Sequence, residues 1–355
     1  MKLASFTLLL STLFPIAAFG SANHPKVLII FDMEGVSGVT DNDSTDFAHP
    51  EKYAVGRQFL TDDVNAAVNG LIAGGAGSIL VQDGHGSGNS EGPDILLDRL
   101  DPRASFDFRN YPFDPYSTGL DGSIDAIVCV GMHARAGTNG FIAHTDTIGI
   151  RYKINDVEFT ETHIVALSAA RWGIPVIMVS GDDVLESQLK FDFPQMEYAT
   201  VKIAKGHNSA VAFSPPEVSR RIESAARNAM VKFLAGGFHP YYLPPPYNFL
   251  LTFGDYLQAE NAAIFPGVSR VGESSVQYQT AAFVDGLKTS YILLRLRNYI
   301  LDRLMRILEH DPGGKKYLDQ LRQTVDLDLL DPDKVPDWAK PQPKQASKRL
   351  YWGDN

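Results

Sequence analysis

Two acidic residues follow a short apolar run near the start of the chain. Residues 27–31 are all apolar, and Asp32 and Glu34 come directly after them, ahead of Gly35. Because side chains alternate along an extended strand, these two carboxylates point to the same side, with Cα atoms about 7 Å apart. They can share one hard divalent cation. An isolated Asp-x-Glu pair is more commonly a loop cap and a solvated acid, so the pair needs further ligands to indicate a metal site.

Histidines occupy the same place after two other apolar runs. His85 follows the run at 78–82, and His133 follows the run at 124–130. The carboxyl ends of parallel strands meet at one edge of an open α/β sheet, which is where ligands bind. We therefore expect both imidazoles to lie beside Asp32.

Two further residues extend this pattern. His144 lies in the segment after His133, and Glu161 stands at the start of an expected helix. A carboxylate is favoured at a helix N-terminus by the helix dipole in any case, so Glu161 has a structural explanation beside a metal-binding one.

Alternating strands and helices are expected to position these residues. The alternation predicts an α/β fold with a mostly parallel sheet covered by helices, followed by a smaller C-terminal α+β unit after a Pro-rich connector at 240–246. The expected strands of the sheet are 27–31, 78–82, 124–130 and 174–180, and the expected helices are 54–73, 161–172 and 217–234. The C-terminal unit is expected to contain a strand at 248–253 and a helix at 281–308.

The N-terminus has the order of a secretory signal peptide. Lys2 precedes an apolar run at 8–18 and small residues through Ala22, which predicts cleavage and an exported, periplasmic or secreted protein. The run is short for a membrane span, so no stable membrane insertion is expected after cleavage. The predicted division is a signal peptide at 1–22, a metal-binding α/β domain at 23–239, a C-terminal α+β unit at 247–309 and a peripheral tail at 310–355.

Composition argues against nucleic acid as a partner. The formal net charge is −10, and no basic run is long enough to follow a phosphate backbone.

Cys129 is the only cysteine and lies in an apolar run, so no internal disulfide can form and a buried, inert thiol is expected.

Together these motifs resemble the M55 family of zinc peptidases, the DppA-type D-aminopeptidases. The similarity covers roughly residues 26–308, and the motifs occur in the same order and at similar intervals. The chain departs from the family in its leader, in its C-terminal tail and in a short deletion between His144 and Glu161. The motifs are Asp32-Met33-Glu34-Gly35, Asp83-Gly84-His85, Gly131-Met132-His133-Ala134-Arg135, His144, Asn155-Asp156 with Glu161, Ser180-Gly181-Asp182-Asp183 and Ser274-Ser275-Val276-Gln277-Tyr278.

The resemblance implies a metallo-aminopeptidase that hydrolyses short peptides or amides with an N-terminal D-amino acid at a two-zinc site. It implies that Asp32 bridges both ions and that His144 is the catalytic residue, as a nucleophile or as an acid and base. The remaining ligands would be Glu34 and His133 at one ion, and His85 and Glu161 at the other. Imidazole and carboxylate ligands without thiolate suit zinc, while Mn²⁺ or Co²⁺ could occupy the same site.

The family also implies a homo-oligomer, such as a ring-shaped decamer, that restricts substrates to short peptides containing D-amino acids. Arg135 could orient a substrate carboxylate or pair with a structural acid. Asp182 and Asp183 follow the fourth strand on the same edge, where they either support a ligating histidine or cap a helix.

Two other interpretations stay open at this stage. An apolar strand followed by Asp-x-acid-Gly, with the later Asp182-Asp183, also looks like a haloacid-dehalogenase-type magnesium phosphatase with Asp32 as nucleophile. That interpretation leaves the histidines and Glu161 without a function. The other is an exported metal- or peptide-binding protein without catalytic activity, which a peptide-cleavage assay would distinguish.

Overall fold

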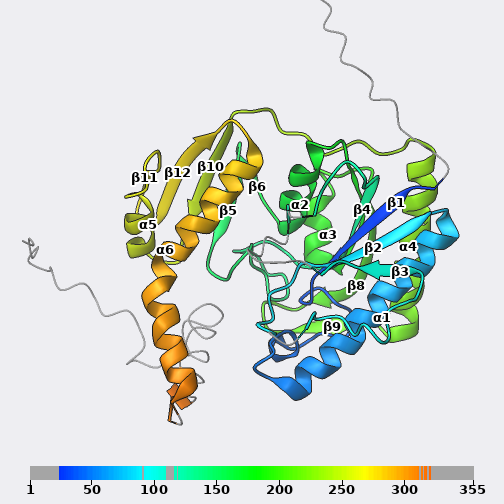
Figure 1. The fold of residues 1–355 in the computed structure, drawn as a ribbon, viewed down its shortest axis with the longest axis horizontal. Coiled ribbons are helices and arrows are strands. Elements are labelled where there is room, and N and C mark those ends of the chain that lie inside the picture. Colours follow the sequence, from blue (N-terminus) through cyan, green and yellow to red (C-terminus); the bar gives the residue numbers. More distant parts are fainter. Residues whose placement is uncertain are drawn as a thin grey trace, which may run out of the picture.

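The computed structural model describes residues 24–89, 92–108, 116–117 and 119–311, with single positions up to 320. The predicted signal peptide and most of the predicted tail lie outside the described residues. Two sheets organise the part of the chain that is described, one seven-stranded and the other five-stranded (Figure 1).

The seven-stranded sheet is parallel except at one edge. All its neighbouring strands pair in parallel apart from β8 and β9. Strand β4 is buried along its whole length, as expected for a parallel sheet covered on both faces. The strands, in spatial order, are β3 (Ala104–Phe106), β2 (Ser78–Asp83), β1 (Lys26–Phe31), β4 (Ala126–Met132), β7 (Val176–Asp182), β8 (Glu197–Ala204) and β9 (Ala210–Ala212). The α/β fold class and the four expected strands are confirmed, with small shifts at the strand ends.

Helices cover both faces of this sheet. Helices α1 (Pro50–Gly74) and α4 (Pro215–Leu234) contact each other on one face, and α2 (Glu161–Ala170) lies on the other with the short α3 (Asp183–Leu189). Along β1, odd-numbered side chains pack with α1 and α4, while even-numbered ones pack with α2 and α3. Helix α1 ends at Gly75, whose φ of 105° is a left-handed cap that glycine adopts without strain.

The five-stranded sheet is antiparallel and is accompanied by α5 (Tyr256–Ala262) and the long α6 (Phe283–His310). Its strands, in spatial order, are β11 (Ser269–Val271), β12 (Ser275–Thr280), β10 (Tyr247–Thr252), β5 (Arg151–Ile154) and β6 (Val157–Glu158). The last two strands come from inside the predicted 23–239 domain, so this sheet is shared between the two predicted units. The boundaries of those units stay a prediction.

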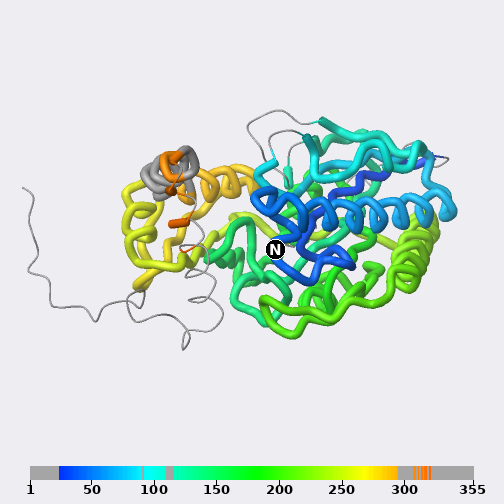
Figure 2. The backbone as a smooth tube through the Cα atoms, turned by 90° about the horizontal axis from the view of Figure 1, so that it is seen from below, coloured from blue at the N-terminus to red at the C-terminus, as the bar shows by residue number. Residues whose placement is uncertain are grey.

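The register of the central strands sets the position of the candidate site. Phe31 is paired with Asp83 on β2 and with Val130 on β4, so the residues that follow these three strands emerge at the same edge. Figure 1 shows the five-stranded sheet and α6 to one side of the seven-stranded sheet, and in Figure 2 the yellow segment that contains β11 and β12 lies on that side as well. Among the described residues, every helix is too short or too polar to cross a lipid bilayer.

Candidate metal centre

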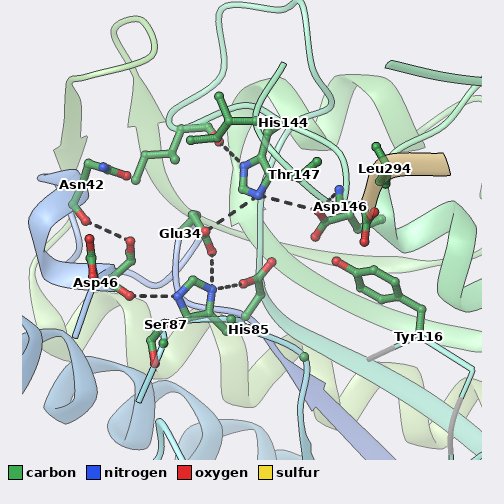
Figure 3. Close-up of a pocket in the computed structure, with 18 of the residues that line it drawn as sticks. Glu34, Asn42, Asp46, His85, Ser87, Tyr116, His144, Asp146, Thr147 and Leu294 are labelled. Carbon is green, nitrogen blue, oxygen red and sulfur yellow. Dashed lines mark hydrogen bonds and ion pairs between the residues drawn. The ribbon is translucent and has the colours of Figure 1, made fainter. Parts of the chain in front are cut away.

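The five predicted metal ligands converge beyond the carboxyl ends of the central strands. Figure 3 shows two of them, Glu34 and His85, facing each other. Among the described residues the five ligands form two groups that share Asp32, and Glu34 and His133 form a third group with His144. The ligand atoms of each group lie within 4.8 Å of one another. In the first group, His85 Nδ1 lies 3.0 Å from Asp32 Oδ1 and 3.1 Å from Glu34 Oε2. In the second, His133 Nε2 lies 3.4 Å from Asp32 Oδ2 and 3.2 Å from Glu161 Oε2.

This geometry favours a different ligand pairing from the one expected from the sequence. Glu34 lies with His85 and Glu161 with His133 in the groups that share Asp32, whereas the expected pair of Glu34 and His133 occurs only with His144, and none of the groups joins His85 to Glu161. The reason is the strand order, because β2 and β4 flank β1 on opposite sides and α2, which begins with Glu161, contacts β4. Asp32 lies between the groups, in keeping with the expected bridging position.

Backbone carbonyls fix the orientation of the three histidine rings. In each ring one nitrogen lies within hydrogen-bond distance of a carbonyl oxygen and must therefore donate its proton there. The other nitrogen faces the carboxylates, which is how metal-ligating histidines are held. The three bonds are His85 Nε2 to Thr45 O at 2.9 Å, His133 Nδ1 to Ala134 O at 3.0 Å, and His144 Nδ1 to Ile142 O at 2.8 Å.

Two buried ligand atoms support a cation at this position. Within the described part of the chain, Glu34 Oε2 and His133 Nε2 are shielded from water and make no hydrogen bond of good geometry, so their polar contacts are ion pairs, with His85 for Glu34 and with Asp32 and Glu161 for His133. Buried polar atoms are seldom left without a hydrogen bond, and a bound cation would supply the missing partner. A set of carboxylate and imidazole donors fits a divalent ion such as zinc.

The buried charges of the cluster perturb one another. Burial, together with the Glu34 carboxylate, raises the pKa of Asp32 to about 7. Burial also acts to raise the pKa of Glu34 and Glu161, but His85 holds the pKa of Glu34 well below its ordinary value and His133 lowers that of Glu161 to about 2. The concentration of carboxylates therefore attracts positive charge to this edge.

His144 lies against the second group. Its Nε2 is 3.9 Å from Glu34 Oε1 and 3.8 Å from Glu161 Oε1, and its ring stacks on that of His133 with centroids 4.1 Å apart. Burial and the charge of His133 lower the pKa of His144. The lowered pKa favours a neutral ring that can accept a proton at pH 7.

A capping box places Glu161 at the first position of α2. The Thr160 side chain accepts a hydrogen bond from His163 N, and Thr160 N donates to His163 Nδ1 at 3.2 Å. His163 Nε2 lies 3.1 Å from Asp192 Oδ2, which fixes the tautomer of this buried ring. The N–H of Asp146 donates to Glu161 Oε1 at 2.6 Å. Glu161 is thus held both through its helix and through its carboxylate.

Four of the five predicted ligands, Asp32, Glu34, His85 and Glu161, line a pocket of about 520 Å³. His144 and the carboxylate-bearing Asp46 and Asp146 line it, and Tyr116 forms part of its wall (Figure 3). Helix α6, which accompanies the second sheet, adds Tyr291 and Leu294 to this space. Sequence analysis gave no indication of the contribution from α6, because its apolar spacing predicts only a packed helix.

The residues predicted with supporting roles lie outside the set that lines this pocket. Asp182 caps α3 by accepting a hydrogen bond from Leu185 N at 2.8 Å, and its other oxygen accepts one from Phe141 N at 2.9 Å. It therefore anchors the segment that leads to His144. Asp183 accepts a hydrogen bond from Ala204 N at 2.8 Å. These backbone contacts give both carboxylates structural roles and speak against the phosphatase interpretation, in which they would hold magnesium.

Arg135 contributes a backbone contact near this segment, since its N–H donates to Gln188 Oε1 at 3.0 Å. A substrate contact for its guanidinium stays a prediction.

Lys202 was missed by sequence analysis, although it is wholly buried and hydrogen-bonded to the turn that carries Glu34. A lysine in a strand usually faces solvent, so the sequence offers little that would have identified it.

Comparison with known proteins identifies the family. The D-aminopeptidase family, peptidase family M55, matches residues 26–291. A D-aminopeptidase from Bacillus subtilis (strain 168) is 27% identical over 275 residues, which are 76% of this chain and 97% of that protein. The solved structure of the Zn-dependent D-aminopeptidase DppA from Bacillus subtilis, a self-compartmentalizing protease, aligns with a TM-score of 0.70 and 26% identity over 76% of this chain and 97% of that one. The matched region contains every candidate ligand, and the chain belongs to the M55 family of D-aminopeptidases.

Proposed function

We propose that this chain is an exported, zinc-dependent D-aminopeptidase that binds two zinc ions and hydrolyses short peptides or amides with an N-terminal D-amino acid. The observation that carries the proposal is the pair of ligand groups around Asp32. Membership of the family supports the reaction class, and the zinc dependence of the DppA relative supports the choice of metal. Mn²⁺ or Co²⁺ would suit the same ligands.

The ligands assigned to the two ions follow the observed geometry. Asp32 contributes one carboxylate oxygen to each group, Glu34 and His85 complete the first, and His133 and Glu161 complete the second. Bound there, two divalent ions would polarise the scissile carbonyl and lower the pKa of water.

His144 is the proposed catalytic residue. Its Nε2 faces the space between Glu34 and Glu161, while the bond from Nδ1 to Ile142 O prevents the ring from turning. In the neutral state that its lowered pKa favours, Nε2 can accept a proton and return it to the leaving nitrogen. The same lone pair would serve in nucleophilic attack.

The walls of the pocket are suited to a short substrate with a cationic terminus. Asp46 and Asp146 place carboxylates around the cavity, which favours a protonated α-amine near the metal ligands. Tyr116, Tyr291 and Leu294 provide larger surfaces for a side chain. A pocket of about 520 Å³ has room for a few residues of a peptide at most.

Export and assembly complete the proposal. The signal-peptide pattern at 1–22 supports export. The DppA relative is self-compartmentalizing, which supports a homo-oligomer that encloses its active sites, such as a ring-shaped decamer. Light scattering on the purified protein measures the oligomer mass, and N-terminal sequencing of the exported protein reports the cleavage site.

A substrate panel on purified protein tests the reaction. We expect matched D- and L-aminoacyl amides to be cleaved with preference for the D form, with two zinc ions bound per chain by mass spectrometry. Asp32→Ala should lose both metal and activity, whereas His144→Ala should keep the metal and lose turnover. His239→Ala, which changes an exposed histidine, is the matched control and should behave as the parent. Full turnover by His144→Ala, or metal binding without turnover by the parent, would contradict the proposal.

A further inference from the structure

A buried lysine on the neighbouring strand β8 holds the turn that carries Glu34. Lys202 has no exposed surface. Its ammonium donates hydrogen bonds to the carbonyl oxygens of Glu34 at 2.5 Å, Val36 at 2.9 Å and Val39 at 2.6 Å. An ammonium has three N–H donors, and all three are used within one turn of six residues.

The turn brings three carbonyl oxygens close to the Lys202 ammonium. Three carbonyl oxygens that converge on one point repel each other, and buried carbonyls without a donor are rarely found in folded proteins. Other contacts hold the turn elsewhere, since Gly35 N donates to Gly131 O at 2.7 Å, and Ser37 donates to Asp63 through both N and Oγ. Lys202 is the contact that binds the carbonyl of Glu34 itself.

The same ammonium lies next to the segment that leads to His144. Its Nζ is 4.4 Å from the centre of the Phe141 ring, a cation–π distance. Lys202 is also the strand partner of Asp182, which accepts a hydrogen bond from Phe141 N. Lys202 is separated from the pocket, because it does not belong to the residues described as lining it.

We infer that Lys202 is a positioning residue that sets the place of the Glu34 carboxylate, and thereby the affinity of the metal group formed by Asp32, Glu34 and His85. This inference rests on the proposed two-metal function. The second group, formed by His133 and Glu161 with Asp32, is held by β4 and α2 and has no contact of this kind with Lys202 among the described residues. The effect of losing Lys202 should therefore fall on one metal ion more than on the other.

The test compares metal affinity in Lys202→Met with that in the intact parent protein. Met has a similar length and cannot donate, so all three carbonyls lose the ammonium, while the carbonyl of Val36 keeps the N–H of Val39 at 3.2 Å. Zinc is titrated against a chromogenic chelator, and Co²⁺ absorption spectra report the geometry of the ligands independently of activity. We expect one ion to bind about tenfold or more weakly, with an altered Co²⁺ spectrum, while the other keeps the affinity of the parent.

Two variants separate positioning from general destabilisation. Val201→Ala removes buried packing from the adjacent residue, whose side chain points to the other face of the strand, and it should lower the thermal midpoint without changing the Co²⁺ spectrum. Lys202→Arg keeps a cation and several donors, so it should restore part of the lost affinity and folds even where Lys202→Met does not.

The outcomes distinguish this inference from the function on which it rests. Two results in folded Lys202→Met would overturn the positioning role. One is that both ions bind with the affinity of the parent protein, and the other is that both ions are weakened to the same extent. If Lys202→Met does not fold and Lys202→Arg does, the Arg variant decides. Metal affinity and a Co²⁺ spectrum equal to those of the parent protein would then also overturn the positioning role. A parent protein that binds neither ion would instead overturn the proposed function.

Discussion

Replacing Asp182 by Ala should destabilise the fold measurably, because one side chain satisfies two buried backbone amides. The carboxylate accepts from Leu185 N as the N-cap of α3 and from Phe141 N in the segment before His144. Loss of an N-cap destabilises by about 1 kcal/mol. Leaving the buried N–H of Phe141 without an acceptor adds about 1–3 kcal/mol. The free energy of unfolding should therefore fall by about 2–4 kcal/mol.

The Asn variant separates the two contributions. Asp182→Asn keeps one oxygen for the cap but presents an amide N–H₂ to the second backbone donor, so only the loss of about 1–3 kcal/mol is expected. Urea denaturation of chelator-treated protein, followed by circular dichroism, measures both variants. Turnover should fall too, because the segment that leads to His144 loses its anchor at Phe141.

An exposed acid provides the control for Asp182. Asp62 pairs only with Arg99 at the surface in the described contacts, so Asp62→Ala should change the free energy of unfolding by less than about 1 kcal/mol. If Asp182→Ala is no less stable than Asp62→Ala, the two amide contacts do not have the role inferred from the structure.

Three further predictions concern metal content, thiol reactivity and pH. His85→Ala should reduce the bound zinc from two ions to about one by mass spectrometry, and retention of both ions would contradict the ligand groups. Cys129 is buried, which raises the pKa of its thiol, so it should react with Ellman's reagent only after unfolding, and rapid labelling of native protein would be the opposite result. Burial raises the pKa of Asp63 from 3.8 to about 7, so between these values the native state retains a proton that the unfolded chain has lost. The free energy of unfolding of metal-free protein should then decrease as pH rises from about 4 to 7, by up to about 1.4 kcal/mol per pH unit, and an unchanged slope in Asp63→Asn would refute this attribution.

The edge of the sheet could be predicted from the sequence because its central strands are continuous apolar runs. Polar residues that follow such strands must emerge together at their carboxyl ends, and this placed Asp32, His85 and His133 correctly. The pairing of ligands could not be predicted in the same way. It depends on which neighbour lies on which side of β1, and apolar periodicity carries no information about that order.

Strands of mixed polarity were also not predicted from the sequence. Strand β8 alternates between polar and apolar residues, and β5 contains Arg151 and Lys153, so neither reads as a buried run. The sequence therefore could not predict that β5 and β6 belong to the second sheet. Lys202 was missed for the same reason, because only the folded structure shows three carbonyls of a distant turn around its side chain.

Because α6 lines part of the pocket, the residues that shape the substrate space and the residues that would bind metal lie on different elements. The proposed metal ligands are fixed by the strands and helix of the large sheet, whereas Tyr291 and Leu294 belong to an element that carries none of them. Mutations on that helix can reshape the room available to a substrate while the proposed metal ligands and His144 stay in place. Substrate specificity can therefore change without a change in the reaction. A search for variants with a new substrate range would begin with that helix.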